Sequence, residues 1–220
     1  MNDESPLCRQ GRPKDTVKHE EIVLAATKLF MEKGYELTSM EAVARLAGVS
    51  KLTIYSHFAD KKELFRAIVQ MRCDKIGMPV CLLDYAQMPV EDALWDISRA
   101  AMAKIMTPDS VRLIRVIHAE VLHHPEIAGI YYEVGPRRVR MAFADLLRAF
   151  NRLGKLSVPD PATASDQFFS LLKGEMLQRV LMSLSPLPEA AELEAHIKQT
   201  IDFFLAAYGP KNPPPATKAP

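Results

Sequence analysis

Apolar side chains recur along most of this chain at the spacing of an α-helix. A first stripe, at positions i, i+3, i+4, i+7 and i+8, consists of Ile22, Ala25, Ala26, Leu29 and Phe30. Gly34 follows it at the place of a left-handed C-terminal cap. Helical periodicity continues through the chain, and no alternating pattern of useful length indicates a strand. The sequence therefore predicts an all-α fold.

Two short helices are predicted next. Thr38 and Glu41 have the form of a capping box, and the apolar face that follows them stops at Gly48. Gly48 makes a turn, and Ser50 is a suitable N-cap for a third helix that runs to about residue 58. A helix, a tight turn with glycine and another helix predict a helix-turn-helix.

The third helix is crowded with hydrogen-bonding side chains. Ile54 and Phe58 lie four residues apart and can anchor it to the first two helices. That arrangement leaves donors suited to phosphate oxygens on the other sides, namely Ser50, Lys51, Thr53, Tyr55 and His57. For Tyr55 the alternative is a core tyrosine with its hydroxyl at the surface.

A fourth helix is predicted to begin with another capping pair, Asp60 and Glu63. Lys61 lies in its first turn, where the free N–H groups and the positive end of the helix dipole favour an anion such as phosphate.

Residues 38–65 read TSMEAVARLAGVSKLTIYSHFADKKELF. This segment closely resembles the DNA-binding signature of the TetR family of bacterial transcriptional regulators, and the resemblance covers roughly residues 15–69. It implies that Thr53, Tyr55, His57 and Lys61 hold DNA phosphates, while Lys51 and Leu52 face base edges. This division is physically sensible, because phosphate contacts position a protein and base contacts specify the sequence. Many family members carry a small residue in place of Leu52, so the target sequence does not transfer.

Upstream of this segment, residues 10–14 read QGRPK. Such an extended basic arm could enter a minor groove beside the recognition helix, or it could be a solvated tail. The full set of predicted DNA-binding residues is Arg12, Lys14, Thr38, Ser50, Lys51, Leu52, Thr53, Tyr55, His57 and Lys61.

Longer helices are predicted in the second part of the chain. Start signals occur at Thr107, Pro136, Asp160 and Pro188. Their apolar faces are wider than one stripe, which implies burial against the subunit core and against something else. In the TetR resemblance the second partner is another copy of the chain, with residues 160–184 and 188–208 in a four-helix bundle. Leu177 and Phe204 are then expected at the interface.

A homodimer also suits the predicted DNA contact, since two reading heads must reach half-sites roughly 34 Å apart on a near-palindromic operator. The stretch HHPEIAGIYYEVGPRRVRMAFADLLRAF, residues 123–150, is more weakly similar to the AefR-like C-terminal domains of a subset of the family.

The family resemblance further implies a small-molecule pocket that controls the separation of the two heads. Candidate wall residues are Trp95, Met102, Ile105, His118, Val121, Leu122, Tyr131, Phe143, Leu147, Phe168, Leu172 and Met176. For each of them plain core is the more ordinary alternative, because Met and aromatic residues at helical spacing fill any all-α domain. Their mixture favours an apolar or aromatic effector, either fatty, phenolic or drug-like, over an anionic one.

The composition and charge of the chain are consistent with the predicted DNA-binding protein. The chain has 220 residues, 48% of them hydrophobic, and a net charge of +1, so any DNA contact must come from locally placed charges. No apolar run approaches a membrane span and the N-terminus lacks signal-peptide features, so we expect a cytoplasmic protein without membrane contact. The expected layout is an arm at 1–14, a DNA-binding domain at 15–72, an effector and dimerisation domain at 73–209, and a disordered Pro-rich tail at 210–220.

Metal, cofactor and enzyme functions find little support in the sequence. Cys8, Cys73 and Cys81 have no metal-ligand spacing and suit reduced thiols. His118 lies five and six residues before His123 and His124, so these rings do not share one helix face. No nucleophile elbow and no phosphate-binding glycine loop occurs. The sequence predicts a ligand-responsive repressor without cofactor or metal; the alternative is a helical scaffold or dimerisation protein with a degenerate DNA-binding head.

Overall fold

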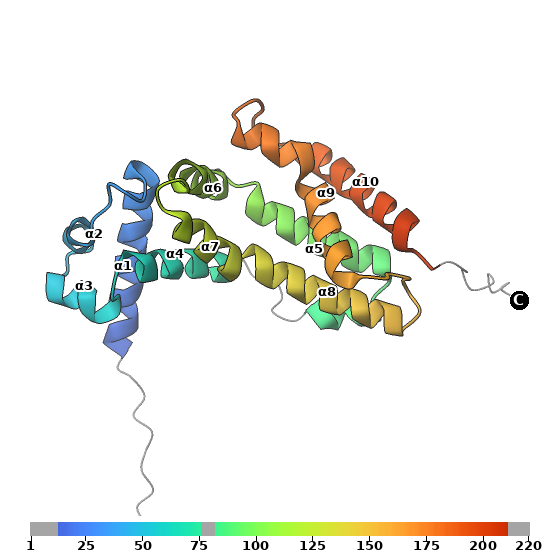
Figure 1. Ribbon diagram of the computed structural model, residues 1–220, viewed down its shortest axis with the longest axis horizontal. Coiled ribbons are helices and arrows are strands. Elements are labelled where there is room, and N and C mark those ends of the chain that lie inside the picture. Colours follow the sequence, from blue (N-terminus) through green and yellow to red (C-terminus); the bar gives the residue numbers. More distant parts are fainter. Residues whose placement is uncertain (1–12, 76–81, 211–220) are drawn as a thin grey trace, which may run out of the picture. The chain divides into compact units, whose positions relative to one another are not determined.

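The computed structural model describes residues 13–75 and 82–210 (Figure 1). Within these ranges the chain is helical and contains no strand, which confirms the all-α prediction. The elements in chain order are α1 (Pro13–Lys33), α2 (Met40–Leu46), α3 (Lys51–His57), α4 (Lys61–Lys75), the 3-10 helix η1 (Leu82–Gln87), α5 (Val90–Ile105), α6 (Pro108–Glu120), α7 (Pro125–Val134), α8 (Pro136–Arg152), α9 (Pro161–Leu181) and α10 (Ala190–Tyr208). In the described part of the chain, every helix is too short or too polar to cross a membrane.

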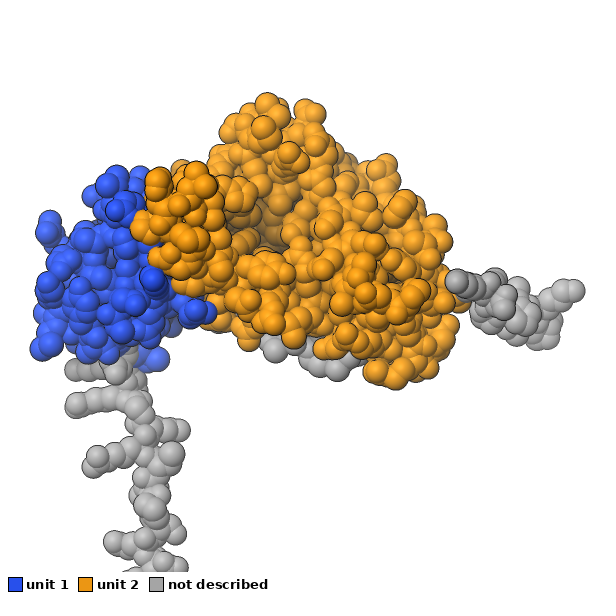
Figure 2. Space-filling model, viewed as in Figure 1, with its two compact units in different colours: residues 1–68 blue, residues 69–220 orange. Residues whose placement is uncertain are grey.

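The chain divides into two compact units (Figure 2), unit 1 at residues 1–68 and unit 2 at residues 69–220. The division falls inside α4, a few residues before the domain boundary predicted at 72. Arg12, Cys8 and Cys81 lie outside the described residues, as do the side chains of Lys14 and Cys73 and nearly all of both predicted flexible ends. The backbone of Pro13 and Lys14, the last two residues of the predicted arm, belongs to α1.

Unit 1 holds the helix-turn-helix of α2 and α3 on a small aromatic core. The rings of Phe30 and Tyr35 stack with centroids 5.5 Å apart, and Phe65 meets Tyr35 edge-on at 5.6 Å. Gly34 and Gly48 adopt φ angles of 82° and 67°, which confirms the turns predicted at these positions.

The N-terminus of α2 differs from its prediction by one residue. Ser39, and not Thr38, is the N-cap, since its Oγ accepts a hydrogen bond from the Ala42 N–H at 3.1 Å. The Thr38 hydroxyl instead donates to the Gly34 carbonyl at 2.8 Å, at the C-terminus of α1. The turn after α1 directs Thr38 back into unit 1, which explains the shift.

The caps predicted for α3 and α4 are confirmed. Ser50 Oγ accepts from the Thr53 N–H at 3.0 Å, and Asp60 Oδ1 accepts from the Glu63 N–H at 2.8 Å. Glu63 reaches back and accepts from the Ala59 N–H at 2.6 Å. These local bonds satisfy donors that a helix leaves free in its first turn.

Unit 2 is built around α5, α8, α9 and α10, with α8 beside α9 (Figure 1). Phe168 lies at its centre, 4.8 Å from the Phe143 ring and 5.1 Å from the Phe204 ring. The predicted starts at Thr107 and Asp160 are confirmed, because both side chains cap helices. The last helix begins at Ala190, just after the predicted start at Pro188. The helices α5 and α7 were not predicted from the sequence.

The helix α9 is kinked at Gly174, whose φ of 37° and ψ of −150° are not helical. A residue with a side chain rarely adopts this backbone conformation, which explains why glycine suits the position. His196 of α10 donates from Nε2 to the Leu172 carbonyl at 2.9 Å, beside the kink. The kink therefore divides α9 into two segments that face different neighbours, which periodicity did not predict.

Candidate nucleic-acid interface and ligand cavity

The helix α3 is anchored from one side and open on the other. Ile54 is fully buried and Phe58 is 2% exposed, which confirms the two predicted anchors. Ser50 caps the helix, and its hydroxyl also lies 2.8 Å from the Thr53 hydroxyl. The caps and anchors fix the seven residues of α3, although so short a helix has little stability of its own.

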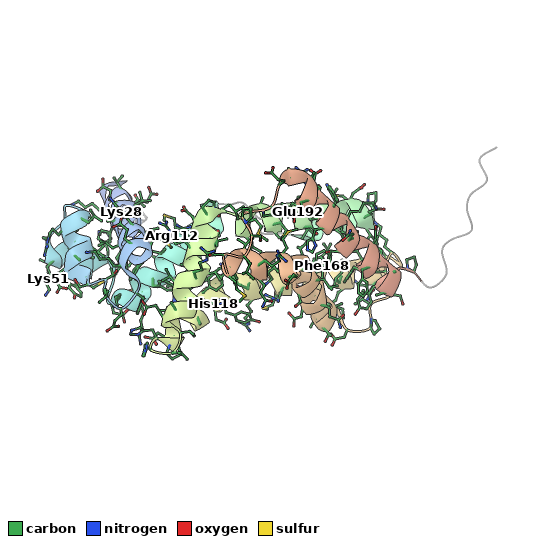
Figure 3. The ribbon with its side chains drawn as sticks, turned by 90° about the horizontal axis from the view of Figure 1, so that it is seen from above. Lys28, Lys51, Arg112, His118, Phe168 and Glu192 are labelled. Atoms are coloured by element: carbon green, nitrogen blue, oxygen red, sulfur yellow. The ribbon has the colours of Figure 1, made fainter. Side chains whose placement is uncertain are left out.

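The open side of α3 carries Lys51, Leu52 and Tyr55. Leu52 is 82% exposed and Tyr55 is 41% exposed, so the alternative of a core tyrosine is wrong. Figure 3 shows Lys51 at the outer surface of the helix-turn-helix, away from the body of unit 1. A leucine that is almost wholly exposed gains nothing from folding, and such a residue next to a lysine and a tyrosine suits a binding surface.

Lys51 is held in place by α2. Its Nζ lies 2.7 Å from Oε1 of Glu41 and 5.8 Å from the centroid of the Tyr55 ring. The hydrogen bond from Lys51 lowers the pKa of the Glu41 carboxyl, and the same bond raises the pKa of Lys51. Both groups are exposed, so water and salt weaken this pair. The sequence did not indicate Glu41 as a partner, because ten positions separate it from Lys51.

Other predicted DNA ligands are engaged inside unit 1. Thr38 is only 1% exposed and its hydroxyl donates to the Gly34 carbonyl, so this hydroxyl is turned into unit 1 and its predicted contact with DNA stays a prediction. Lys61 Nζ donates to the carbonyls of Tyr35 and Glu36 at 2.8 and 3.2 Å, which leaves one donor for a phosphate. His57 is half-buried, with its ring centroid 5.9 Å from that of His19.

Unit 2 contains a cavity of about 590 Å³. Its wall is formed by residues of α5, α6, α7, α8 and α9 together with the last part of α4. Figure 2 shows a hollow on the visible face of unit 2. The volume lies within the range of about 300–1,000 Å³ that is typical of small-molecule sites.

Few of the predicted wall residues line this cavity. Ile105, His118 and Tyr131 do so. The residues that are instead fully buried in the core of unit 2 are Met102, Phe143, Leu147, Phe168 and Leu172. The remaining ones pack against that core or lie at the surface, namely Trp95, Met176, Val121 and Leu122, the last of which is 87% exposed. Helical periodicity marks a buried face, but it does not distinguish a core face from a cavity wall.

The cavity wall also carries charge that the sequence prediction missed. Its basic members are Arg72, Lys104, Arg138, Arg140 and Lys173, and no acidic residue belongs to the described wall. Arg138 and Arg140 come from the run PRRVR at 136–140, which was the available signal. Burial, and to a smaller extent the positive charge of Arg140, lower the pKa of Lys173 from 10.5 to about 8, and the negative charge of Asp166 opposes this shift.

We expect the stability of the protein to rise with pH between about 8 and 10.5 relative to a Lys173→Met variant. Over this window the unfolded chain keeps a proton on Lys173 that the folded chain has lost, so raising the pH favours the folded state. Urea titrations of both proteins at a series of pH values measure this difference. A difference in unfolding free energy that stays constant across the window would show that Lys173 titrates normally.

Metal ligands do not cluster in the described part of the chain, where no group of three or more His, Cys, Asp or Glu side chains is placed to hold an ion. His124 Nδ1 lies 3.7 Å from Glu126 Oε1, and His118 lines the cavity.

The predicted dimer helices expose large apolar side chains in the single subunit. Phe203 is 63% exposed and Leu171 is 40% exposed, and Met182 and Leu184 follow α9 with 62% and 64% exposure. Leu177 and Phe204, expected at the interface, are instead 8% and 1% exposed and belong to the interior of unit 2. The prediction for these two positions is wrong because the inner and outer faces of α9 and α10 are both apolar.

Both parts of the chain match models of known protein families. One described as "AefR-like transcriptional repressor, C-terminal domain" matches residues 92–210, and one described as "Bacterial regulatory proteins, tetR family" matches residues 22–68. The HTH-type transcriptional repressor BepR of Brucella suis is 34% identical over 179 residues, which cover 79% of this chain and 85% of that protein. The HTH-type transcriptional activator FasR of Mycolicibacterium smegmatis is 36% identical over 64 residues, and the match spans only 29% of either chain.

Two solved structures superpose on most of this chain. A TetR-family transcriptional regulator from Mesorhizobium loti MAFF303099 superposes with a TM-score of 0.78 at 30% identity, over 90% of this chain and 100% of that one. The flavonoid-responsive regulator FrrA superposes with a TM-score of 0.76 at 33% identity, over the same fractions.

Proposed function

We propose that this chain, which belongs to the TetR family of bacterial transcriptional regulators, is a ligand-responsive repressor that binds a near-palindromic operator as a homodimer. The observation that carries the proposal is the open side of α3, where Lys51, Leu52 and Tyr55 stand exposed on a helix that is anchored from below. In a bacterial cell this surface would meet DNA in the cytoplasm.

The chemistry of α3 suits the major groove. Lys51 can donate to O6 or N7 of guanine, and Leu52 can contact the methyl group of thymine. Tyr55 and Thr53 offer hydroxyls to phosphate oxygens, which position the helix without reading sequence. In this proposal Lys51 exchanges Glu41 for DNA on binding, and the exposed ion pair opposes that exchange only weakly.

The dimer would bring two such helices to neighbouring half-sites. We place its interface on the outer faces of α9 and α10, where Leu171 and Phe203 are exposed. The cavity in unit 2 would hold the effector, whose binding shifts the population of dimers away from the spacing that fits the operator. Repression is favoured by the AefR-like family model and by the similarity to BepR along most of the chain.

Two other functions compete with this proposal. The similarity to the activator FasR supports activation, which transcription measured in vitro with and without the protein would separate from repression. A scaffold protein with a degenerate head would show no salt-sensitive affinity for DNA.

The experiment that tests the proposal is selection of bound duplexes from a random DNA pool, followed by affinity measurements at two salt concentrations. Recovery of a near-palindrome whose affinity falls steeply with salt supports a dimeric operator-binding protein. Failure of the folded dimer to enrich any sequence would favour the scaffold function.

We expect Tyr55→Phe and Lys51→Met to affect DNA binding in different ways. Loss of the Tyr55 hydroxyl should weaken binding to all duplexes alike, by about tenfold, because a phosphate contact carries no sequence information. Loss of the Lys51 ammonium should reduce the preference for operator over a single-base mismatch by about tenfold. Fluorescence anisotropy with both duplexes measures the two effects, and Arg148→Met, which removes a positive charge in unit 2, is the control. If both variants bind these duplexes as the parent does, α3 does not lie in the major groove.

A further inference from the structure

The cavity of unit 2 contains positive charge that its own wall does not neutralise. Arg72 and Arg140 reach carboxylates at 3.5 and 2.9 Å, but these belong to Asp109 and Asp166, whose side chains are 74% and 65% exposed and lie outside the wall. Lys173 makes no direct hydrogen bond or ion pair with any residue that the structure describes, and Asp166, which pairs with Arg140, acts on it only through its charge. A half-buried ammonium without a carboxylate partner is unusual in a folded protein.

A second polar group of the wall also lacks an acceptor. The Nε of Arg72 is buried and has no hydrogen-bond partner among the described residues. Leaving a buried donor unbonded costs free energy that an incoming oxygen atom would recover. Neither observation depends on the other: the Arg72 Nε indicates a missing hydrogen-bond acceptor, and Lys173 indicates a missing negative charge.

The groups around Lys173 form a compact binding arrangement. Phe169 precedes Lys173 by one helical turn on α9, so both side chains lie on the same face of that helix. The guanidinium carbon of Arg140 lies 6.0 Å from the centroid of the Phe169 ring. Two cations beside one aromatic ring match a ligand that joins an acidic group to an apolar body.

The rest of the wall supplies an apolar surface. Leu113 and Ile114 of α6, Val139 of α8 and Leu177 of α9 all belong to it. Burial of a hydrocarbon or aromatic body against these side chains would provide the general affinity, and the cations would orient the ligand.

Given the ligand-responsive function proposed above, we propose that this cavity binds an amphipathic organic acid, with its carboxylate at Lys173 and Arg140 and its apolar body along Leu113, Ile114 and Leu177. This assignment differs from the sequence prediction, which favoured an apolar or aromatic effector over an anionic one. The low pKa of Lys173 agrees with it, because the cavity without an anion disfavours the protonated amine.

Matched acids and esters test the assignment. Calorimetric titration of the purified full chain with 2-naphthoic acid, decanoic acid and their methyl esters compares ligands of nearly equal shape that differ in charge. We expect at least one acid to bind about tenfold or more tightly than its ester, the effect of a charge-assisted hydrogen bond. Lys173→Met should abolish that preference and leave ester binding unchanged, Lys173→Arg should keep it, and Arg148→Met should behave as the parent.

The assignment would be overturned if neither acid bound, or if both acids bound no more tightly than their esters. It would also be overturned if Lys173→Met kept the parent's preference for the acid. The affinity for operator DNA is measured separately in the presence of each acid and each ester. This measurement distinguishes failure of the organic-acid assignment from failure of the proposed regulatory function. If only the esters release the protein from DNA, the effector is not an organic acid, but the proposal of ligand-responsive regulation stands. Tight, Lys173-dependent binding of an acid that leaves DNA affinity unchanged would support the site and contradict its regulatory role.

Discussion

The Phe203→Glu variant is expected to be a folded monomer that binds operator at least about a hundredfold more weakly than the parent. Phe203 is 63% exposed in the single subunit, so a charge there does not disturb the subunit core. In the proposed dimer the same charge would be buried in an apolar interface, which is costly without a partner. Loss of the dimer also removes the gain in affinity that comes from joining two reading heads, typically a factor of about 10²–10⁴.

Met141→Glu is the matched control for this prediction. Met141 is 55% exposed on α8, outside the proposed interface, so the same change of chemistry should leave the oligomeric state and the DNA affinity close to those of the parent. Light scattering gives the mass and anisotropy gives the affinity. If Phe203→Glu remains dimeric, the interface lies on another surface; if Met141→Glu also dissociates, α8 takes part in it.

Phe168→Ala is expected to lower the unfolding free energy of unit 2 by about 3–5 kcal/mol, because it leaves a large cavity at the centre of a close-packed core. The Phe168 side chain is fully buried, and its ring centroid lies 4.8, 5.5 and 5.1 Å from those of Phe143, Phe169 and Phe204. Several neighbours would have to move together to fill the space, and close-packed interiors allow little such movement.

Leu122→Ala is the control, because the sequence placed Leu122 in the same set of wall residues as Phe168. With 87% of its surface exposed, Leu122 has no packing to lose, and we expect a change within about 0.5 kcal/mol. Urea unfolding followed by circular dichroism measures both variants. A loss below 1 kcal/mol for Phe168→Ala would mean that it borders a cavity, one of the two alternatives left open by the sequence, and not the core.

The best sequence predictions concerned interactions between neighbours in the chain. Ser50, Asp60, Thr107 and Asp160 were expected at helix starts, and each caps one. A cap and the N–H group it bonds lie within three residues of one another, so the chain need not fold for the pattern to be visible. Thr38 shows the limit, because a neighbouring serine could cap equally well and the turn after α1 decided between them.

The two candidate sites differ in how far the sequence anticipated them. Lys51, Leu52 and Tyr55 were expected on the open side of α3, and they lie there, since the anchors and the outward residues belong to one short helix. The cavity draws its wall from six helices, and its cations come from positions as far apart as 72 and 173. No local pattern joins these residues, and most of the expected wall proved to be core.

The sequence by itself determined the all-α class, the order of most helices, the helix-turn-helix and the side chains that α3 presents, because periodicity, caps and glycine turns act over a few residues. The tertiary structure alone decided that Lys61 bonds to the loop after α1, that α9 bends at Gly174 and that Lys173 faces a cavity without a carboxylate. These features depend on which helices meet and on the volume left between them, and residues distant in the chain set both.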